Sequence, residues 1–198
     1  MADADASCLV LASASPRRSA LLLQIGVRHR VLPAHVDETR LANESIEQCV
    51  TRLAQAKARQ VSAQLGDPSI PVLGADTAVV VDRLMLGKPR DRADALAMLA
   101  RLSGTEHEVL SAVALLHAGS MSQRLSRSRV RFRALHTAEC EAYWDSGEPA
   151  DKAGAYAIQG GAAVFVQSLH GSYSGVMGLP LFETATLLAA AAVPMWQA

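Results

Sequence analysis

The sequence predicts a mixed α/β protein, in which helices flank a twisted sheet of parallel and antiparallel strands. Helical and strand patterns alternate in the first half of the chain, which is typical of β-α-β units with parallel strands. Strand patterns joined by tight turns dominate the second half, which is typical of antiparallel hairpins. The chain has 198 residues and 50% of them are hydrophobic, so it can bury a sizeable core as a single domain over residues 1–198.

The first predicted elements are short. An apolar run predicts a buried strand over residues 8–12. In the helix that follows, Ser15 is the expected N-cap, Pro16 takes the first helical position and Gly26 marks the end. A second strand is predicted over residues 29–32, before a polar turn. This segment is therefore expected to form strand, helix and strand in succession.

A long amphipathic helix is predicted over residues 44–65. Its apolar residues are spaced for one helical face: Ile46, Val50, Leu53 and Val61. A strand and hairpin follow over residues 71–86, with Asp82 and Arg83 at the tip. Asp91 is then the expected N-cap of a helix that ends near Gly104.

Long strands open the second half of the chain. They are predicted over residues 106–117 and 123–135, joined by an Ala-Gly-Ser turn. A helix over residues 137–146 follows, and a strand is predicted over residues 163–169. The last helix is expected to begin near Pro180. These elements complete a mixed sheet with flanking helices.

The bulk charge excludes several partners. Lys plus Arg and Asp plus Glu both number 19, so no overall field would hold the protein on nucleic acid or on an anionic membrane. Asp3 and Asp5 stand where a signal peptide needs positive charge. The apolar stretch over residues 187–193 is far shorter than the roughly 18 residues of a membrane span. We therefore expect a soluble, cytoplasmic protein.

The cysteines fit the same compartment. Cys8, Cys49 and Cys140 are widely spaced, odd in number and form no C-x-x-C pair. Reduced thiols explain this pattern better than disulfides or a zinc site.

An anion site is predicted where the first strand meets the first helix, in the segment SASPRR over residues 13–18. The free N–H groups of a first helical turn, with the guanidinium groups of Arg17 and Arg18, can bind phosphate oxygens. An exposed, capped helix is the alternative. Arginine in a first turn opposes the helix dipole, however, and this favours a bound anion.

The most informative charges lie in the segment VLGADTAVVVDRLMLGKPRD, residues 72–91. An apolar strand delivers Asp76 and Thr77, and Lys88 follows a tight hairpin. Sheet enzymes commonly place catalytic groups at such strand ends. Asp76 could hold a divalent metal or take a proton from an attacking water, and Lys88 could neutralise phosphate charge. A turn cap at Asp76 and a solvated Lys88 are the alternatives.

Glu38 and Lys57 are two further charged candidates for the site. Taken singly, each could be an ordinary surface residue, and they become candidates only together with Asp76 and Lys88. A Gly-rich loop, DKAGAYAIQGG over residues 151–161, adds glycines whose backbone could approach a ligand. Its Gln159 carries an amide that can both donate to and accept from a base edge.

Arginines repeat at every second residue of the segment SRSRVRFR, residues 126–133. This spacing places them on one strand face, which could bind nucleic acid. The neutral net charge and the absence of aromatic residues on that face favour a solvated or edge-protecting strand instead. The histidines show no metal-ligand spacing, and the chain has no G-x-S-x-G or Walker motif.

Five segments stand in order along the chain: LASASPRRSALL, GADTAVVVDRLMLGKPRD, LSGTEHEV, GEPADKAGAYAIQG and GSYSGVMGLPLFET. Together they resemble the Maf family, the septum-formation-inhibitor-like nucleotide pyrophosphatases, from about residue 9 to residue 188. The resemblance implies two lobes around a cleft, similar to the inosine triphosphate pyrophosphatase architecture, and often a homodimer. It also implies hydrolysis of a nucleoside triphosphate to monophosphate and pyrophosphate, assisted by Mg²⁺ or Mn²⁺.

The resemblance assigns roles to residues of this chain. It implies that Asp76 is the catalytic carboxylate, that Lys57 and Lys88 act with it, and that Glu38 and Asp76 hold the metal. The implied substrate contacts are Ser13, Arg17, Arg18, Thr77 and Gln159. The loop DKAGAYAIQG resembles that of the members selective for dTTP and UTP, whereas members acting on 7-methyl-GTP lack it. The implied task is housecleaning of pyrimidine nucleotides, including modified ones.

Two other hypotheses stay open from the sequence. The family's name motivates a regulator of cell division that binds nucleotides without hydrolysing them. The arginine-rich strand motivates a nucleic-acid contact, although no such partner is expected.

Overall fold

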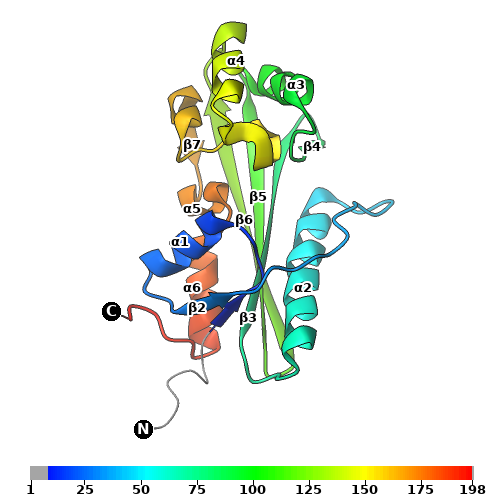
Figure 1. Ribbon diagram of the computed structural model, residues 1–198, viewed down its shortest axis with the longest axis vertical. Coiled ribbons are helices and arrows are strands. Elements are labelled where there is room, and N and C mark those ends of the chain that lie inside the picture. Colours follow the sequence, from blue (N-terminus) through cyan, green and yellow to red (C-terminus); the bar gives the residue numbers. More distant parts are fainter. Residues whose placement is uncertain (1–8, 198) are drawn as a thin grey trace. The chain divides into compact units, whose positions relative to one another are not determined.

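A computed structural model of the chain describes residues 9–197 and has a mixed α/β fold (Figure 1). In chain order, the helices and strands are β1 (Leu9–Leu11), α1 (Pro16–Gln24), β2 (His29–Val31), α2 (Ile46–Leu65), β3 (Val72–Val81), β4 (Leu84–Leu86), α3 (Arg92–Leu102), β5 (Glu106–His117), β6 (Ser120–Phe132), α4 (Thr137–Asp145), β7 (Val166–His170), α5 (Tyr173–Met177) and α6 (Leu181–Ala190). Short 3₁₀ helices cover Glu148–Asp151, Ala153–Ala155 and Gly161–Phe165.

The strands form one seven-stranded sheet in the order β2-β1-β3-β5-β6-β7, with β4 paired to β3. β1 runs parallel to β2 and β3, whereas the β3–β4 and β6–β7 pairs are antiparallel. The predicted mixed sheet with flanking helices is therefore confirmed. Among residues 9–197, no helix is long and apolar enough to cross a lipid bilayer.

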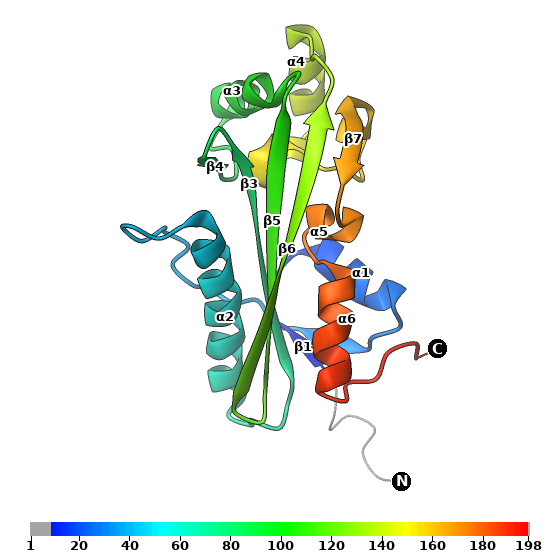
Figure 2. The same cartoon turned by 180° about the vertical axis from the view of Figure 1, so that it is seen from behind.

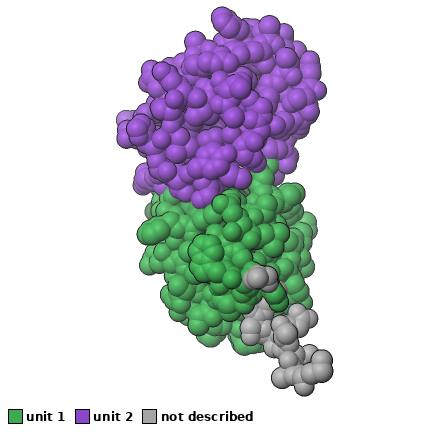
Figure 3. Space-filling model, turned by 90° about the vertical axis from the view of Figure 1, so that its left-hand side faces the viewer, with its two compact units in different colours: residues 1–76, 111–126, 178–198 green, residues 77–110, 127–177 purple. Residues whose placement is uncertain are grey.

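The chain divides into two compact units (Figure 3). Unit 1 contains residues up to Asp76, residues 111–126 and residues from Gly178 onward. Unit 2 contains residues 77–110 and 127–177. The boundary thus falls inside three strands, β3, β5 and β6.

Unit 1 is built around α2. Figures 1 and 2 show α2 on one face of the unit 1 strands and α1 and α6 on the other. A small core joins α2 to β1 and β3 through Val10, Ala58, Val61 and Val72, all buried. Apolar residues at helical spacing on α2 thus meet apolar residues of two parallel strands, as the sequence pattern predicts.

Several element boundaries differ from the prediction. α2 begins at Ile46 and not at residue 44, because Ser45 is the N-cap: its hydroxyl accepts from the Gln48 N–H and its own N–H donates to the Gln48 side chain. β6 begins at Ser120, because the turn before it needs only Ala118 and Gly119, both with positive φ.

β6 also ends earlier than predicted, at Phe132, and beyond that end the Leu135 N–H donates to the Ser103 hydroxyl. The strand predicted over residues 163–169 begins only at Val166. Residues 161–165 form a 3₁₀ helix that buries Ala162 and Phe165, three residues apart. α5 was not predicted, and the predicted start of the first strand, Cys8, lies outside the described residues.

The arginine face of β6 alternates as predicted. Arg127, Arg129 and Arg131 are exposed, and the residues between them are buried. Arg129 forms an ion pair with Glu106, at 3.5 Å. The interpretation as an edge-protecting strand is wrong, because β6 lies between β5 and β7. The face fits a solvated strand surface.

Unit 2 holds an aromatic cluster with a buried histidine. The His107 ring packs edge-on against Phe132 and Tyr156, with centroids 5.0 and 5.4 Å away. Its Nε2 shares a hydrogen bond with the Tyr156 hydroxyl at 2.9 Å, whereas its Nδ1 is buried with no hydrogen-bond partner among the described residues. Burial lowers the pKa of His107 from 6.5 to about 4.

We expect His107 to make folding stability depend on pH. Below its ordinary pKa of 6.5 the unfolded chain takes up a proton that the folded chain refuses, so stability falls as the pH drops from 6.5 toward about 4. The loss amounts to about 3 kcal/mol in full. In His107→Phe this contribution should vanish, although the unpaired Tyr156 hydroxyl lowers stability at neutral pH by about 1–3 kcal/mol.

The measurement is urea unfolding across this pH range. The control is His170→Phe at an exposed position, which should keep the wild-type slope. An unchanged slope in His107→Phe would contradict the prediction.

Candidate active site

The central feature of unit 1 is a lysine held between two carboxylates. Lys57 Nζ lies 2.7 Å from Asp76 Oδ1 and 2.6 Å from Glu38 Oε1. Lys57 and Asp76 are both buried, whereas the Glu38 side chain is 56% exposed. The structure thus brings together three of the predicted site residues, which lie far apart in sequence.

The approach of α2 to β3 places this lysine. Asp76 and Gly74 are two residues apart in β3 and therefore point to the same face of the sheet. A Cβ added at Gly74 would overlap the Ala54 carbonyl oxygen and lie 2.9 Å from the Ala58 nitrogen, both backbone atoms of α2. The missing side chain at Gly74 lets the helix come close enough for Lys57 to reach Asp76.

Burial and the neighbouring charges both act on the pKa of Asp76. Desolvation raises the pKa of this carboxyl group, while the positive charges of Lys57 and Arg18 lower it. The nearby Glu38 raises it further. Asp76 is thus a buried carboxylate whose ionisation depends on two cations, which is the kind of perturbed group found at catalytic sites.

The predicted anion site joins the same cluster. Arg18 donates from one guanidinium nitrogen to the Ser13 hydroxyl, at 3.0 Å, and from Nε to the Gly178 carbonyl, at 2.8 Å. Burial lowers the pKa of Arg18, and the Asp76 carboxylate opposes this. Arg17, half-buried on α1, adds a second positive charge near Arg18. Ser15 caps α1 by position, without a side-chain hydrogen bond.

The remaining predicted residues belong to unit 2. Thr77 begins the unit 2 part of β3, while Lys88 and Gln159 are exposed. The Gly154 N–H donates to the Gly87 carbonyl, at 3.0 Å. The loop that carries Lys88 and the Gly-rich loop that carries Gln159 are therefore held together.

The glycines of that loop make room for protein side chains. A Cβ at Gly160 would overlap the Glu148 carboxylate, and one at Gly161 would lie 3.4 Å from the Tyr143 ring. One at Gly154 would lie 3.0 Å from Val79. Protein side chains therefore lie on the side of these glycines where a Cβ would stand. The contacts of Tyr143 and Glu148 with this loop were not predicted, although the segment GEP, residues 147–149, directly precedes the loop.

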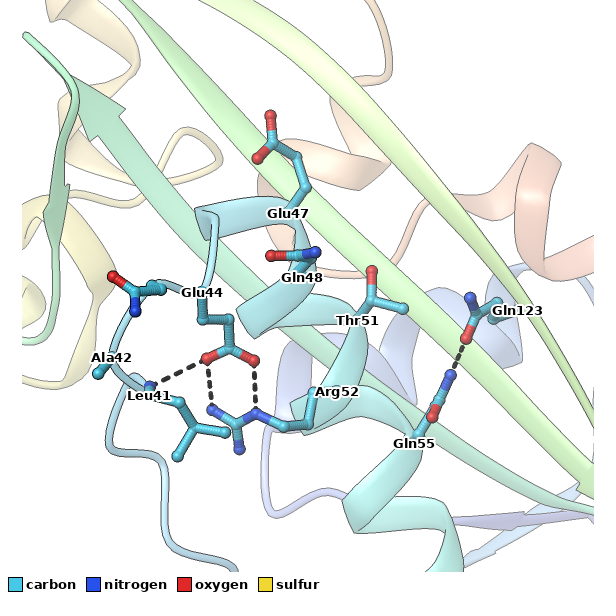
Figure 4. Close-up of a pocket in the computed structure, with 10 residues that line it drawn as sticks. Leu41, Ala42, Glu44, Glu47, Gln48, Thr51, Arg52, Gln55 and Gln123 are labelled. Atoms are coloured by element: carbon cyan, nitrogen blue, oxygen red, sulfur yellow. Dashed lines mark hydrogen bonds and ion pairs between the residues drawn. The ribbon is translucent and has the colours of Figure 1, made fainter.

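A separate hollow of about 580 Å³ lies in unit 1, at the start of α2 (Figure 4). Glu44 and Arg52, which line it, form an ion pair at 2.6 Å, and the side chains of Gln55 and Gln123, which also line it, are hydrogen-bonded to each other. None of the predicted site residues lines it.

Comparison with known proteins places this chain in a family. The family model described as Maf-like protein matches residues 8–191. The dTTP/UTP pyrophosphatase of Bordetella parapertussis is 55% identical over 96% of this chain and 95% of its own length. That of Saccharophagus degradans is 53% identical over 96% of this chain and 91% of its own length.

A crystal structure of a nucleoside-triphosphatase, a dITP/XTP pyrophosphatase from Mycobacterium abscessus, is 20% identical to this chain. It covers 64% of this chain and 74% of its own, with a TM-score of 0.41, which adds nothing to the description of the fold. The match of the family model over most of the sequence and the near full-length relatives are decisive: the chain belongs to the Maf family.

Proposed function

We propose that the protein hydrolyses dTTP and UTP to the nucleoside monophosphate and pyrophosphate. The observation that carries the proposal is the identity of 50–55% over nearly the whole chain with relatives called dTTP/UTP pyrophosphatases. In the reaction, water attacks the α-phosphorus, the bond from that phosphorus to the bridging oxygen breaks, and pyrophosphate leaves. The unit 1 cluster around Asp76 supplies groups suited to activating the water and to binding phosphate oxygens.

Asp76 is the proposed catalytic carboxylate. Lys57 holds its Oδ1 at 2.7 Å, and its second oxygen can accept the proton of the attacking water or bind a cation. The guanidinium groups of Arg17 and Arg18 would contact phosphate oxygens, because their geometry matches that of the phosphate. The Ser13 hydroxyl would be a further contact. Lys88 would neutralise charge that develops on the leaving pyrophosphate.

A divalent cation is the proposed cofactor. Among residues 9–197, no group of three His, Cys, Asp or Glu side chains could hold a metal. Two carboxylates, Glu38 and Asp76, do converge on Lys57. This donor set fits Mg²⁺ or Mn²⁺, since Mg²⁺ is commonly bound through one or two carboxylates together with substrate phosphates. When bound, such an ion would withdraw charge from the phosphates.

The base would be selected by Gln159, with Thr77 as a second contact. The uracil or thymine edge alternates acceptor, donor and acceptor, and one amide can pair with two neighbouring groups of it. The exposed position of Gln159 leaves its amide accessible.

We expect Gln159→Ala to lose base preference more than phosphate cleavage. Removing an amide that pairs with the base should lower kcat/KM for UTP about tenfold or more, and much less for nucleotides that the amide does not fit. The measurement compares kcat/KM for UTP, dTTP, CTP and GTP. The control is Gln167→Ala, an exposed glutamine on β7. An equal loss for all four nucleotides would contradict the role.

The proposed function itself is tested with purified protein, Mg²⁺ or Mn²⁺, and a panel of dTTP, UTP, CTP, GTP and 7-methyl-GTP. Release of pyrophosphate and monophosphate is followed for each. Release from dTTP and UTP alone is the expected result. Binding without release would favour the nucleotide-sensing regulator, and preference for 7-methyl-GTP would overturn the assignment of the loop.

A further inference from the structure

A tyrosine and a glutamate brace the Gly-rich loop on both sides of Gln159. The Tyr143 hydroxyl accepts from the Ala157 N–H, at 3.0 Å, and donates to Glu148 Oε1, at 2.6 Å. The other carboxylate oxygen, Glu148 Oε2, accepts from the Gly161 N–H, at 3.1 Å. The N–H groups of Ala157 and Gly161, on either side of residues 158–160, are therefore both bound by this pair of side chains.

The loop backbone is shaped to admit this carboxylate. The φ of Gly160 is −110°, a value that any residue can adopt. Gly160 is therefore not required by its φ angle, but a Cβ there would overlap the Glu148 carboxylate. Glycine at this position keeps the carboxylate in contact with the loop.

We propose that Glu148, through Tyr143 and the Gly161 N–H, is a positioning residue that holds Gln159 in the orientation needed to select the base. This inference rests on the proposed function, in which Gln159 contacts uracil or thymine. Gln159 is exposed while Tyr143, Ala157 and Ile158 are buried, so the loop presents one amide from an anchored backbone. A fixed backbone leaves only the side-chain torsions of Gln159 to be ordered when the base binds.

A graded pair of substitutions tests the role. Glu148→Met removes both accepting oxygens at similar side-chain length, whereas Glu148→Gln keeps one oxygen that can still accept from the Gly161 N–H. We expect Glu148→Met to lower the preference for UTP over CTP about tenfold, mainly through a higher KM for UTP, with partial retention in Glu148→Gln. The matched control is Glu141→Met on α4, a partly exposed residue paired with Arg92, which should keep the wild-type preference.

A second route displaces the carboxylate without removing it. Gly160→Ala should push Glu148 away from the loop and cause the same loss of base preference. A double-mutant cycle then separates positioning from general damage: in a Gln159→Ala background, Glu148→Met should cause no further loss of preference. Thermal melting of each variant identifies those that do not fold.

The outcomes separate this inference from the proposed function. If the wild-type protein shows no preference for UTP over CTP, or if Gln159→Ala keeps that preference, Gln159 does not select the base and the proposed function of the loop fails. If Gln159→Ala loses the preference while folded Glu148→Met and Gly160→Ala both keep it, the positioning role is overturned. Equal losses of kcat for every nucleotide in these variants would also overturn it, because they would indicate a general structural role.

Discussion

Asp76→Asn is expected to lower triphosphate hydrolysis by about a thousandfold, the middle of the range for loss of a general base. The amide has the size of the carboxylate, but it is neutral and can neither take the water proton nor balance a cation. The fold should survive, because Lys57 keeps its partner Glu38 at 2.6 Å and is not left as an unpaired buried charge. The measurement is pyrophosphate release at saturating dTTP, with circular dichroism to verify folding.

A matched control separates catalysis from a general effect of losing a carboxylate. Asp67→Asn changes an exposed residue whose carboxylate binds Ser69 in the turn after α2. This variant should hydrolyse dTTP at the wild-type rate. Full activity in a folded Asp76→Asn protein would remove Asp76 from the proposed mechanism.

Local signals predicted much of the fold. Gly26 lies just beyond the end of α1, with φ of 65°, and Asp91 caps α3 by accepting from the Asp94 N–H. Asp82 and Arg83 both have positive φ at the tip of the β3–β4 hairpin. Each of these features depends on a few neighbouring residues, which is why a single sequence contains enough information to predict them.

Short apolar runs were harder to interpret. Residues 163–165 were predicted as the start of a strand, but they belong to the 3₁₀ helix Gly161–Phe165. Periodicity cannot separate a buried strand from a buried helical turn over so few residues. Tertiary contacts determine which of the two forms, and here Phe165 packs edge-on against Tyr143 and Phe132.

In the candidate active site too, local sequence predicted residues but not their contacts. Asp76 was predicted from its place at a strand end, and Lys57 and Glu38 as charged candidates beside it, with roles added by the family resemblance. Nothing local in the sequence, however, predicts that one ammonium group would contact both carboxylates. That geometry depends on how closely α2 packs on β3. The hydrogen bond from the Gly161 N–H to Glu148 was not predicted for the same reason. It depends on the directions of a side chain and of a backbone N–H group, and these are known only in the folded loop.

Gly74→Ala is expected to be the most damaging small substitution in unit 1. The added methyl group would overlap the Ala54 carbonyl oxygen and meet the Ala58 nitrogen. These are backbone atoms, so no side-chain rotation relieves the overlap and α2 must move. Overpacking of this kind costs about 3 kcal/mol or more, which corresponds to a fall in Tm of roughly 6–12 °C for a chain of this size.

The same substitution should also reduce catalysis in the protein that remains folded. Lys57 lies on α2 between Ala54 and Ala58, so a displaced helix carries its ammonium group away from Asp76 Oδ1. Asp76 then loses one of the two cations that lower its pKa, so the acid limb of its pH–rate profile should move to higher pH. Thermal melting and pH–rate profiles for dTTP hydrolysis measure the two effects. Gly87→Ala is the stability control, because a Cβ there meets no atom within 4 Å and should change stability by less than about 1 kcal/mol. If Gly74→Ala melts at the wild-type temperature and keeps the wild-type pH profile, close packing of α2 on β3 does not position Lys57.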